Sequence, residues 1–405
     1  MNNNRIVSIL ILLGLAIRLL FLPLPGFNID VNDWFAWATR LSHFDFSHFY
    51  SKDIFSDYTP GYLYILSVLG FLKNLLRVTD SYFYLLLKIP AIVSELVIGL
   101  ILYKESKKYV SEKLALLASA FILLTPALIF NSAVWGQIDS ISALLMLSAI
   151  IHLKNKNLII SSIFFGLALL VKPQTLALLP LFAIFLINHF KALHLFKLTM
   201  PGLLIIFIIA FPFFPNQTLA NLAQQIINTA NEYPYNSINA YNLWGVAGFW
   251  INDNQIWNNL SYQTWGYILL AGYWMVIVYF YFRKKLSIYT IATLATLGFF
   301  FLPTRVHERY LYPAIIFLVL TTAMLKSKLL LVLTGMLSFL HFLNLYYVYV
   351  YYNEIYLKLP KILYNPVIYN FLDTHSKELS LTSIIIFILI SATIIKYGAR
   401  ISKTG

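Results

Sequence analysis

Five short segments of the sequence gather ionisable, amide and aromatic side chains between long apolar stretches. The first, residues 26–41, holds Asp30 and Asp33 ahead of Trp37. Because residues three or four apart share one face of a helix, we expect Asp33 and Trp37 to lie together, with Asp30 at or before the helix N-terminus. A carboxylate in that place could act as a general base. A helix-capping aspartate followed by interfacial tryptophan anchors would give the same pattern.

The second segment, residues 56–64, places Asp57 and Tyr58 directly before the expected start of a helix. Pro60 suits the first position of a helix and Thr59 suits the cap before it. Asp57 is a second candidate base, and Tyr58 is a candidate contact for the substrate.

The third segment, residues 131–142, is a short turn that carries Trp135, Gln137 and Asp139. An acid and an amide at membrane depth are costly unless they are paired or solvated in a cavity. Carbohydrate sites combine carboxamides and carboxylates with aromatic surfaces, so this turn suits recognition of a sugar. Capping of the following helix is the alternative role for Asp139.

Basic residues mark the last two segments. In residues 169–180, Lys172 and Gln174 are separated only by Pro173, with almost no loop between apolar stretches. Snorkelling of its ammonium group to the interface would explain a lysine such as Lys172 at a helix end. It does not explain why this lysine falls on the outer side, where the chain otherwise has few basic residues beside its predicted spans. Residues 301–313 bring together Arg305, His307, Glu308 and Arg309. Guanidinium groups match phosphate oxygens bidentately, so this turn is a candidate anion site, with a salt-bridged turn as the alternative.

Together these segments offer the parts of an enzyme that breaks a sugar–phosphate bond. Such an enzyme needs cations where charge develops on the leaving group and a carboxylate where the incoming hydroxyl loses its proton. The candidate bases are Asp30, Asp57 and Asp139. The candidate phosphate ligands are Lys172, Arg305, His307 and Arg309. The candidate sugar or acceptor contacts are Asp33, Asp57, Tyr58, Trp135, Gln137, Asp139, Gln174 and Glu308.

The composition decides which solvent surrounds these segments. Of the 405 residues, 60% are hydrophobic and only 11% are charged, against about 25% charged residues in soluble domains. So large an apolar surplus must face lipid, which excludes a soluble globular protein and a disordered chain. Because the chain has no cysteine, disulfides, thiolate metal sites and cysteine nucleophiles are excluded. In a membrane protein, a net charge of +13 reflects basic loops that set the orientation in the bilayer. Nucleic acid is therefore not an expected partner.

The sequence predicts an all-α polytopic membrane protein with about twelve transmembrane helices. Each predicted span is a mostly apolar stretch near the length of about 20 residues that crosses a bilayer. The spans are residues 6–24, 82–103, 112–130, 140–153, 157–171, 174–188, 197–214, 263–282, 287–302, 309–325, 328–346 and 381–396. The apolar stretch at 60–78 is instead predicted to lie in the outer interface, with Lys73 and Arg77 toward the headgroups.

The distribution of positive charge supports this choice. With 60–78 outside the membrane core, more than half of the 29 basic residues fall in loops on the side of the N-terminus, which the positive-inside rule makes cytoplasmic. These residues are Arg5, Lys104, Lys107, Lys108, Lys113, Lys154, Lys156, Lys191, Lys197, Arg283, Lys284, Lys285, Lys326, Lys328, Lys396, Arg400 and Lys403. Both termini are then cytoplasmic, and large outer segments follow at 25–81, 215–262 and 347–380. The N-terminal stretch shows no small-residue cleavage site and is read as a retained helix.

In their order, these motifs resemble those of the integral-membrane GT-C glycosyltransferases. The chain is similar to the mannosyltransferases of GPI-anchor assembly and to dolichyl-phosphate-glucose glucosyltransferases. The resemblance covers most of residues 1–313, and it rests on the acidic segment before Trp37 and on DYTPGY at 57–62, VWGQIDS at 134–140, KPQ at 172–174 and VHER at 306–309. Two positions depart from it: Thr59 replaces the first proline of the family's DYPP, and Glu95 stands where relatives often have Asp.

The resemblance implies transfer of a hexose, with inversion, from a polyprenyl-phosphate donor to a hydroxyl on the outer face. It favours mannose, with glucose as the alternative. Asp30, seven residues before Trp37, matches the family's general base, and the basic turn at 305–309 would hold the donor phosphate. Because the use of a divalent cation varies among these enzymes, the resemblance assigns no metal site and leaves a divalent cation open. The expected partners are the donor, a glycan, glycolipid or protein acceptor, and membrane lipid.

The rival from another class is a multi-pass transporter or lipid flippase, because twelve spans with both termini inside is a common carrier topology. Carriers usually hold polar groups near the midplane on broken helices, whereas the candidate groups here lie in outer loops. An inactive GT-C relative that serves as an assembly subunit is disfavoured because every motif position keeps an ionisable or amide side chain.

We expect one integral domain over residues 1–405, with the catalytic motifs in 1–313 and further helices and an outer loop in 314–405, in a prokaryotic plasma membrane.

Overall fold

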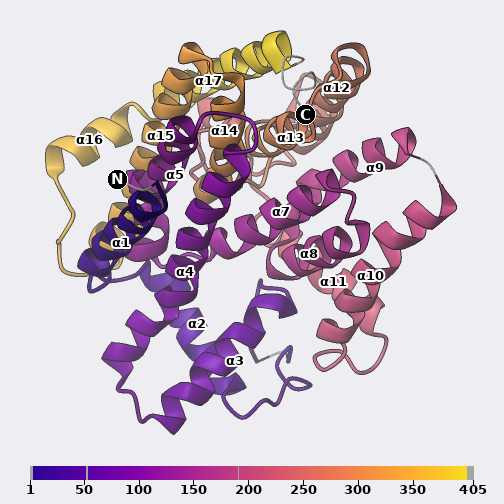
Figure 1. Cartoon of the computed structure of the whole chain (residues 1–405). Helices are drawn as coiled ribbons and strands as arrows, with labels where there is room; N and C mark the ends of the chain where they lie inside the picture. Colours follow the sequence, from indigo (N-terminus) through magenta and orange to yellow (C-terminus); the bar gives the residue numbers. More distant parts are fainter. Residues whose placement is uncertain (1–2, 52, 190, 399–405) are drawn as a thin grey trace. The chain divides into compact units, whose positions relative to one another are not determined.

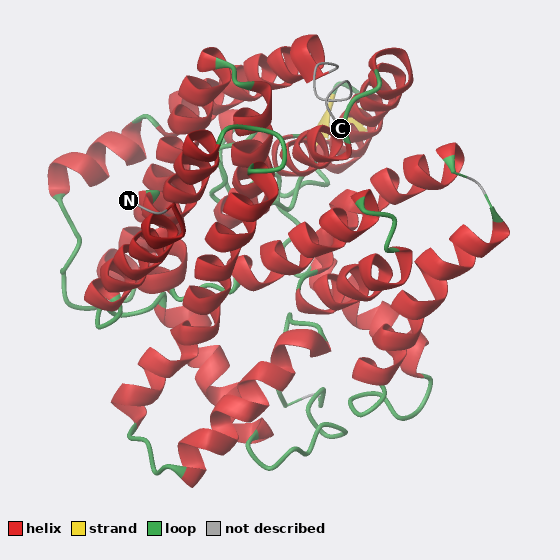
Figure 2. Cartoon of the chain, viewed as in Figure 1, coloured by secondary structure: helices red, strands yellow, loops and turns green. Residues whose placement is uncertain are grey.

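The chain is built almost entirely of helices. The computed structural model describes residues 3–51, 53–189 and 191–398. In this part of the chain the only strands are β1 (Ile256–Trp257) and β2 (Leu260–Ser261), which form a short antiparallel hairpin (Figure 2). The predicted all-α class is therefore confirmed. Arg400 and Lys403, two of the basic residues used above to orient the chain, lie outside the described residues.

A helix occupies each of the predicted apolar stretches (Figure 1). These helices are α1 (Asn3–Phe21), α4 (Asp80–Ser106), α5 (Glu112–Leu124), α7 (Asp139–Lys154), α8 (Leu158–Val171), α9 (Leu179–Asn188), α10 (Ala192–Ala210), α12 (Tyr262–Lys284), α13 (Ile288–Phe301), α14 (Tyr312–Leu325), α15 (Lys328–Tyr349) and α17 (Ser376–Tyr397).

Only some of these helices are long enough to cross a membrane alone. Among the described residues, 6 helices pass by length and composition, or up to 7 if the pair Glu112–Leu124 and Pro126–Trp135, bent by 42°, counts as one span. The expected count of about twelve spans is therefore not confirmed. Length is the reason: α8 has 14 residues, which at 1.5 Å per residue reach about 21 Å, less than a hydrocarbon core of about 30 Å.

The described chain forms two compact units, and the first is called the α2 unit here. It comprises residues 19–94 and 132–233. Its helices α2 (Asn28–Leu41) and α3 (Pro60–Leu75) pack against each other around a buried aromatic core that includes Trp34, Trp37 and Tyr62. Helices α7 and α10 pack on α8, which is followed by the 3₁₀ helix η2 (Pro173–Leu178), and α11 (Thr218–Asn231) follows α10. The apolar stretch at 60–78 is thus a helix, α3, and its 16 residues leave it outside the candidate spans.

The second unit is called the α14 unit and takes the described residues of 1–18, 95–131 and 234–405. Its centre is the pair α13 and α14, whose side chains are almost all buried, and α15 packs on α14 and α17. A fully buried ion pair joins Arg18 Nε and Glu95 Oε2 at 2.8 Å, and the Tyr312 hydroxyl donates to Glu95 Oε1 at 3.0 Å. These contacts explain how Glu95 is accommodated, because a buried charge in a membrane helix requires a partner.

In the described part of the chain, two π-helical segments interrupt the regular helices: η1 (Phe130–Trp135), after the short α6 (Pro126–Ile129), and η5 (Val350–Tyr356), after α15. π-helical turns are rare and occur frequently at functional sites. In η5 the buried Glu354 accepts hydrogen bonds from the backbone N–H groups of Ile362, Leu363 and Tyr364 at 3.2, 2.9 and 2.6 Å. This carboxylate fixes the loop that leads to α16 (Pro366–Thr374).

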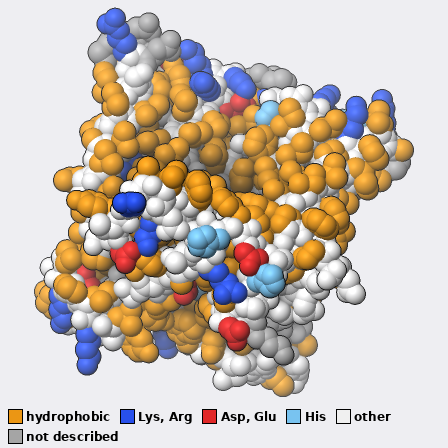
Figure 3. Space-filling model, turned by 90° about the horizontal axis from the view of Figure 1, so that it is seen from below, with side chains coloured by type: hydrophobic (Ala, Val, Ile, Leu, Met, Phe, Trp, Pro, Cys, Tyr) orange, Lys and Arg blue, Asp and Glu red, His pale blue; other side chains and the backbone are white. Residues whose placement is uncertain are grey.

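The face of the molecule that Figure 3 shows is rich in apolar side chains. On α10 only 11% of its most apolar stretch is buried, and the same holds for α12. Exposed side chains on these two helices include Leu203, Leu204, Phe207, Ile208, Tyr267, Met275 and Tyr279. Long apolar helices with exposed apolar faces are what a bilayer requires, so the chain is a multi-pass membrane protein.

Candidate active site

Asp30 lies in the first turn of α2, and the structure shows how its backbone is fixed. The helix is capped by Phe27, without a side-chain hydrogen bond, so the alternative role of Asp30 as a capping residue is wrong. The Phe27 N–H donates to the Trp135 carbonyl at 2.9 Å, and the two aromatic rings stack with centroids 4.3 Å apart. The start of α2 is therefore attached to η1, which carries Trp135.

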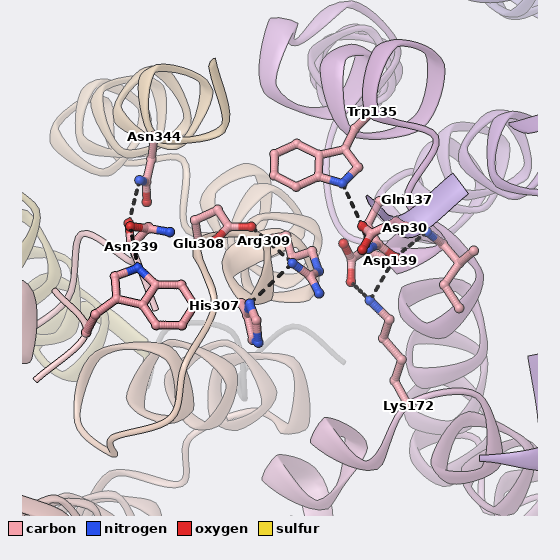
Figure 4. A network of polar contacts seen from close by, with 12 residues as sticks. Asp30, Trp135, Gln137, Asp139, Lys172, Asn239, His307, Glu308, Arg309 and Asn344 are labelled. Atoms are coloured by element: carbon pink, nitrogen blue, oxygen red, sulfur yellow. Dashed lines mark hydrogen bonds and ion pairs between the residues drawn. The ribbon is translucent and has the colours of Figure 1, made fainter. Parts of the chain in front are cut away.

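The Asp30 carboxylate accepts two hydrogen bonds on a single oxygen. Trp135 Nε1 donates to Asp30 Oδ2 at 2.8 Å, and Gln137 Nε2 donates to the same oxygen at 2.7 Å (Figure 4). Among the described residues, Asp30 Oδ1 takes part in no hydrogen bond or ion pair. The two donors thus orient the carboxylate and leave one oxygen able to accept a proton.

Gln137 connects this carboxylate to the other motifs of the α2 unit. Its side chain is fully buried. While its Nε2 faces Asp30, its Oε1 accepts from Lys172 Nζ and from the Tyr58 hydroxyl, each at 3.2 Å, and from the Ile138 N–H at 2.9 Å. The amide orientation is thereby determined, because only its oxygen can accept from the ammonium group.

Lys172 and Asp139 form a buried ion pair at 2.5 Å, beside Gln137 (Figure 4). Asp139 is fully buried and opens α7, while Lys172 follows α8. This pairing meets the requirement that a buried acid have a partner. Side chains from three sequence motifs are therefore linked to Asp30 in one network: Tyr58, Trp135, Gln137, Asp139 and Lys172.

Two further acids lie near Asp30 in the same unit. Partial burial, together with the negative charges of Asp30 and Asp57, raises the pKa of Asp33 to about 6. The segment that carries Asp57 is anchored by α11, where Gln225 Nε2 donates to the Ser56 carbonyl at 2.8 Å and Thr229 Oγ1 to the Asp57 carbonyl at 2.9 Å. Helix α11 thus determines where the DYTP segment lies, a role that its sequence did not indicate.

Gln174 is also buried, at 9% exposure. Its Nε2 has no hydrogen-bond partner in the described part of the chain. A buried amide without a partner is costly, so this group is available for a ligand that supplies an acceptor. Thr59 and Pro60 take the expected cap and first positions of α3, but the Thr59 side chain forms no cap, and its Oγ1 donates to the Leu170 carbonyl at 2.6 Å.

The basic turn belongs to the α14 unit, where Arg305 is engaged by an acid that the sequence did not single out. Arg305 Nε and Nη2 donate to Asp253 Oδ2 and Oδ1 at 2.8 and 3.3 Å, and Thr304 Oγ1 donates to Oδ2 at 2.8 Å. Asp253 is fully buried. The charge of Arg305 is therefore compensated within its own unit.

His307, Glu308 and Arg309 form a second group in this turn (Figure 4). Arg309 Nη1 lies 3.1 Å from Glu308 Oε1 and 3.3 Å from His307 Nδ1. Because a guanidinium group can only donate, His307 Nδ1 is the acceptor, and a neutral imidazole must carry its proton on Nε2. The group therefore offers an arginine and an imidazole N–H as donors.

A segment of the loop that follows α11 runs beside this turn. The Ile238 N–H donates to the Val306 carbonyl at 3.0 Å, and the Arg305 N–H donates to the Tyr235 carbonyl at 2.9 Å. Asn236 holds the loop, since its Nδ2 donates to the carbonyls of Trp244 and Gly248 at 3.1 and 2.7 Å. Asn344 in α15 donates to the Asn239 carbonyl at 2.7 Å. The loop is rich in asparagine, but nothing in the sequence pattern indicated this framework.

No group of three or more His, Asp or Glu side chains in the described ranges is arranged to hold a metal ion.

Residues 76–217 match the family model described as dolichyl-phosphate-mannose-protein mannosyltransferase. These residues carry a GT-C glycosyltransferase domain. The expected superfamily is thus confirmed over this range, and the protein is an enzyme, a glycosyltransferase. The matched range contains Trp135, Gln137, Asp139, Lys172 and Gln174, while Asp30 and the basic turn lie outside it. No curated protein matches the chain.

Proposed function

We propose that the enzyme transfers mannose, with inversion, from a polyprenyl-phosphate-mannose donor to a hydroxyl of a glycan, glycolipid or protein at the extracytoplasmic face. The observation that carries the proposal is the state of Asp30. Two donors hold its Oδ2, and its Oδ1 has no partner among the described residues. A general base requires a carboxylate that is oriented and still able to accept a proton.

In this reaction the acceptor oxygen attacks the anomeric carbon of mannose on the face opposite the phosphate. The bond between that carbon and the phosphate oxygen breaks, and both of its electrons leave with the polyprenyl phosphate. The acceptor hydroxyl gives its proton to Asp30 Oδ1. Trp135 and Gln137 keep the carboxylate in place, and Lys172 with Asp139 fixes Gln137.

The leaving phosphate gains negative charge in the transition state and is stabilised by cations. We assign this role to the basic turn, where Arg309 and His307 lie together and Arg305 is paired with Asp253. Glu308 orients Arg309 through the contact at 3.1 Å. Asp33, Asp57, Tyr58 and Gln174 are left as candidate contacts for the sugar or the acceptor.

The family match favours an enzyme over the transporter or flippase, and no described contact supports the carrier. The outer location of the site is supported by the concentration of basic residues in the opposite loops. Membrane lipid is then the solvent of the donor's polyprenyl chain.

The test is transfer by the purified protein from synthetic polyprenyl-phosphate-mannose and polyprenyl-phosphate-glucose. The acceptors are a mannose-terminated oligosaccharide, a Ser/Thr-rich peptide and a glycolipid fraction. Asp30→Asn is expected to lower kcat at least about 100-fold, the usual contribution of a general base. Asp45→Asn, a change of an exposed carboxylate in the same unit, is the matched control and should leave kcat unchanged. Transfer from polyprenyl-phosphate-glucose alone would mean that the donor sugar is glucose and not mannose. Absence of transfer from either donor to any acceptor would contradict the proposal.

A further inference from the structure

Lys88 is a buried lysine of α4 whose ammonium group is surrounded by main-chain carbonyls. Its exposure is 1%. Nζ lies 2.6 Å from the Leu24 oxygen, 3.0 Å from that of Ala133, 3.1 Å from that of Val134 and 3.3 Å from that of Leu22. An ammonium group has three N–H donors, so its hydrogen-bonding capacity is fully used. No carboxylate takes part in these contacts.

These carbonyls need a donor because of where they stand in the chain. Leu22 and Leu24 lie just beyond the end of α1, and Ala133 and Val134 lie in the last turn of η1. The carbonyls at helix ends have no partner within the helix, and a buried carbonyl without a donor is costly. Lys88 satisfies carbonyls of two separate segments with one side chain.

Both segments lead directly to the Asp30 site. The 22–24 segment continues into Phe27 and then into the turn of α2 that carries Asp30. The 133–134 segment continues into Trp135 and Gln137, the two donors to Asp30 Oδ2. Gly136, which lies between Trp135 and Gln137, adopts a φ of +89°, and a Cβ added there would lie 3.2 Å from Lys88 Cγ. The lysine stem therefore packs directly beneath the turn that presents Gln137.

We propose that Lys88 is a positioning residue for the Asp30 base. By joining the 22–24 and 133–134 segments, its ammonium group sets the separation between the Asp30 carboxylate and the donors that orient it. This inference rests on the proposed function, because it concerns the geometry of the proposed base. It places Lys88 away from the substrate, so its loss changes the rate of the chemical step and leaves donor binding almost unaltered.

The test compares Lys88→Met, which keeps the length of the side chain and removes its donors, with Lys104→Met, which changes an exposed lysine of the same helix. Steady-state transfer by the full-length protein in lipid nanodiscs is measured first. Because a displacement of about 1 Å in an active site reduces rates about 100-fold, Lys88→Met is expected to lower kcat about 100-fold with the donor KM nearly unchanged. Lys104→Met should match the wild type. Lys88→Arg keeps a cationic donor and should recover part of the loss.

A second measurement does not depend on activity. Hydrogen–deuterium exchange of peptides covering 22–34 and 130–138 should rise in Lys88→Met and stay at the wild-type level in Lys104→Met, while α13 and α14 stay protected in both. An unchanged kcat, an equal loss in Lys88→Arg and Lys88→Met, or increased exchange throughout the chain would each overturn the assignment. Absence of transfer by the wild type, with the exchange result as expected, would contradict the proposed function and leave the link between the two segments intact.

Discussion

Asp33 lies one helical turn after Asp30, and its charge state is set by its neighbours. Its pKa is raised from 3.8 to about 6, first by burial and then by the charges of Asp30 and Asp57. In the unfolded chain the same carboxyl group ionises near its ordinary pKa of about 4. Between pH 4 and 6 the folded protein therefore binds more protons than the unfolded chain. Stability must fall as the pH rises through this window, and the full loss is present above pH 6.

Asp33→Asn is accordingly expected to raise the melting temperature above pH 6 and to have almost no effect below pH 4. The reason is that asparagine removes the buried negative charge but resembles the protonated acid in shape. Thermal unfolding of the purified protein from pH 4 to 7.5 measures the difference. Asp45→Asn serves as control, because this carboxylate belongs to an exposed pair with His48 and such pairs contribute little. A constant difference between Asp33→Asn and wild type across the pH range would contradict the expectation.

At the level of single residues, the sequence indicated which motifs lie together better than how their side chains are paired. The motifs that contain Tyr58, Gln137 and Lys172 were expected to act together, and the structure links them. The partner of Arg305 could not be foreseen, because Asp253 lies 52 residues earlier in an irregular loop. Burial of both members decides such pairings, and a local sequence pattern carries no information about it.

At the level of elements, the contact between α2 and α3 controls where Asp30 is held. Gly70 permits this contact, since a Cβ at this position would lie 2.0 Å from the Ala38 carbonyl oxygen. Neither backbone can yield as a flexible side chain would. A small residue is therefore required at the crossing of the two helices.

Gly70→Ala is expected to destabilise the protein by about 1–3 kcal/mol, the usual range for overpacking, and to reduce transfer because α2 must move. Gly335→Ala in α15 is the matched control, because a Cβ at that helical glycine meets nothing within 4 Å. Alanine favours a helix over glycine, so this control should be neutral or slightly stabilising. Melting temperatures and kcat of both variants provide the measurement, and an unperturbed Gly70→Ala protein would argue against the tight crossing.

Helix positions were the part of the fold that the sequence predicted well, because a long apolar run is a local signal. The run at 112–130, for example, was predicted as one helix, but Thr125 and Pro126 divide it. The chain then continues through α6 into the π-helical η1, which places Trp135 beside Asp30. Thr59 takes the expected cap position before Pro60, but its side chain does not cap α3. Its hydroxyl instead donates to the Leu170 carbonyl, 111 residues away. The break at Thr125 and Pro126 follows from a local signal, because the residue before a proline is biased away from the helical conformation. The Thr59 contact depends on a distant part of the chain.

At the scale of the whole molecule, the open prediction is the orientation in the membrane. Charge places the loops around Lys104–Lys113 and Lys154–Lys156 in the cytoplasm only if α3 does not cross the bilayer. If α3 crossed, every later loop would change sides. The proposed outer location of the Asp30 site then depends on the path of a single 16-residue helix.

The absence of cysteine allows this path to be tested directly, because any introduced cysteine is the only thiol. Ser47→Cys precedes α3, Ser81→Cys follows it, and Asn155→Cys lies after α7; all three positions are exposed. With a membrane-impermeant maleimide on intact cells, Ser47→Cys and Ser81→Cys are expected to react, and Asn155→Cys only after permeabilisation. Ser47→Cys and Ser81→Cys on opposite sides would mean that α3 crosses. If Asn155→Cys reacted in intact cells while Ser47→Cys and Ser81→Cys did not, the proposed orientation would be reversed.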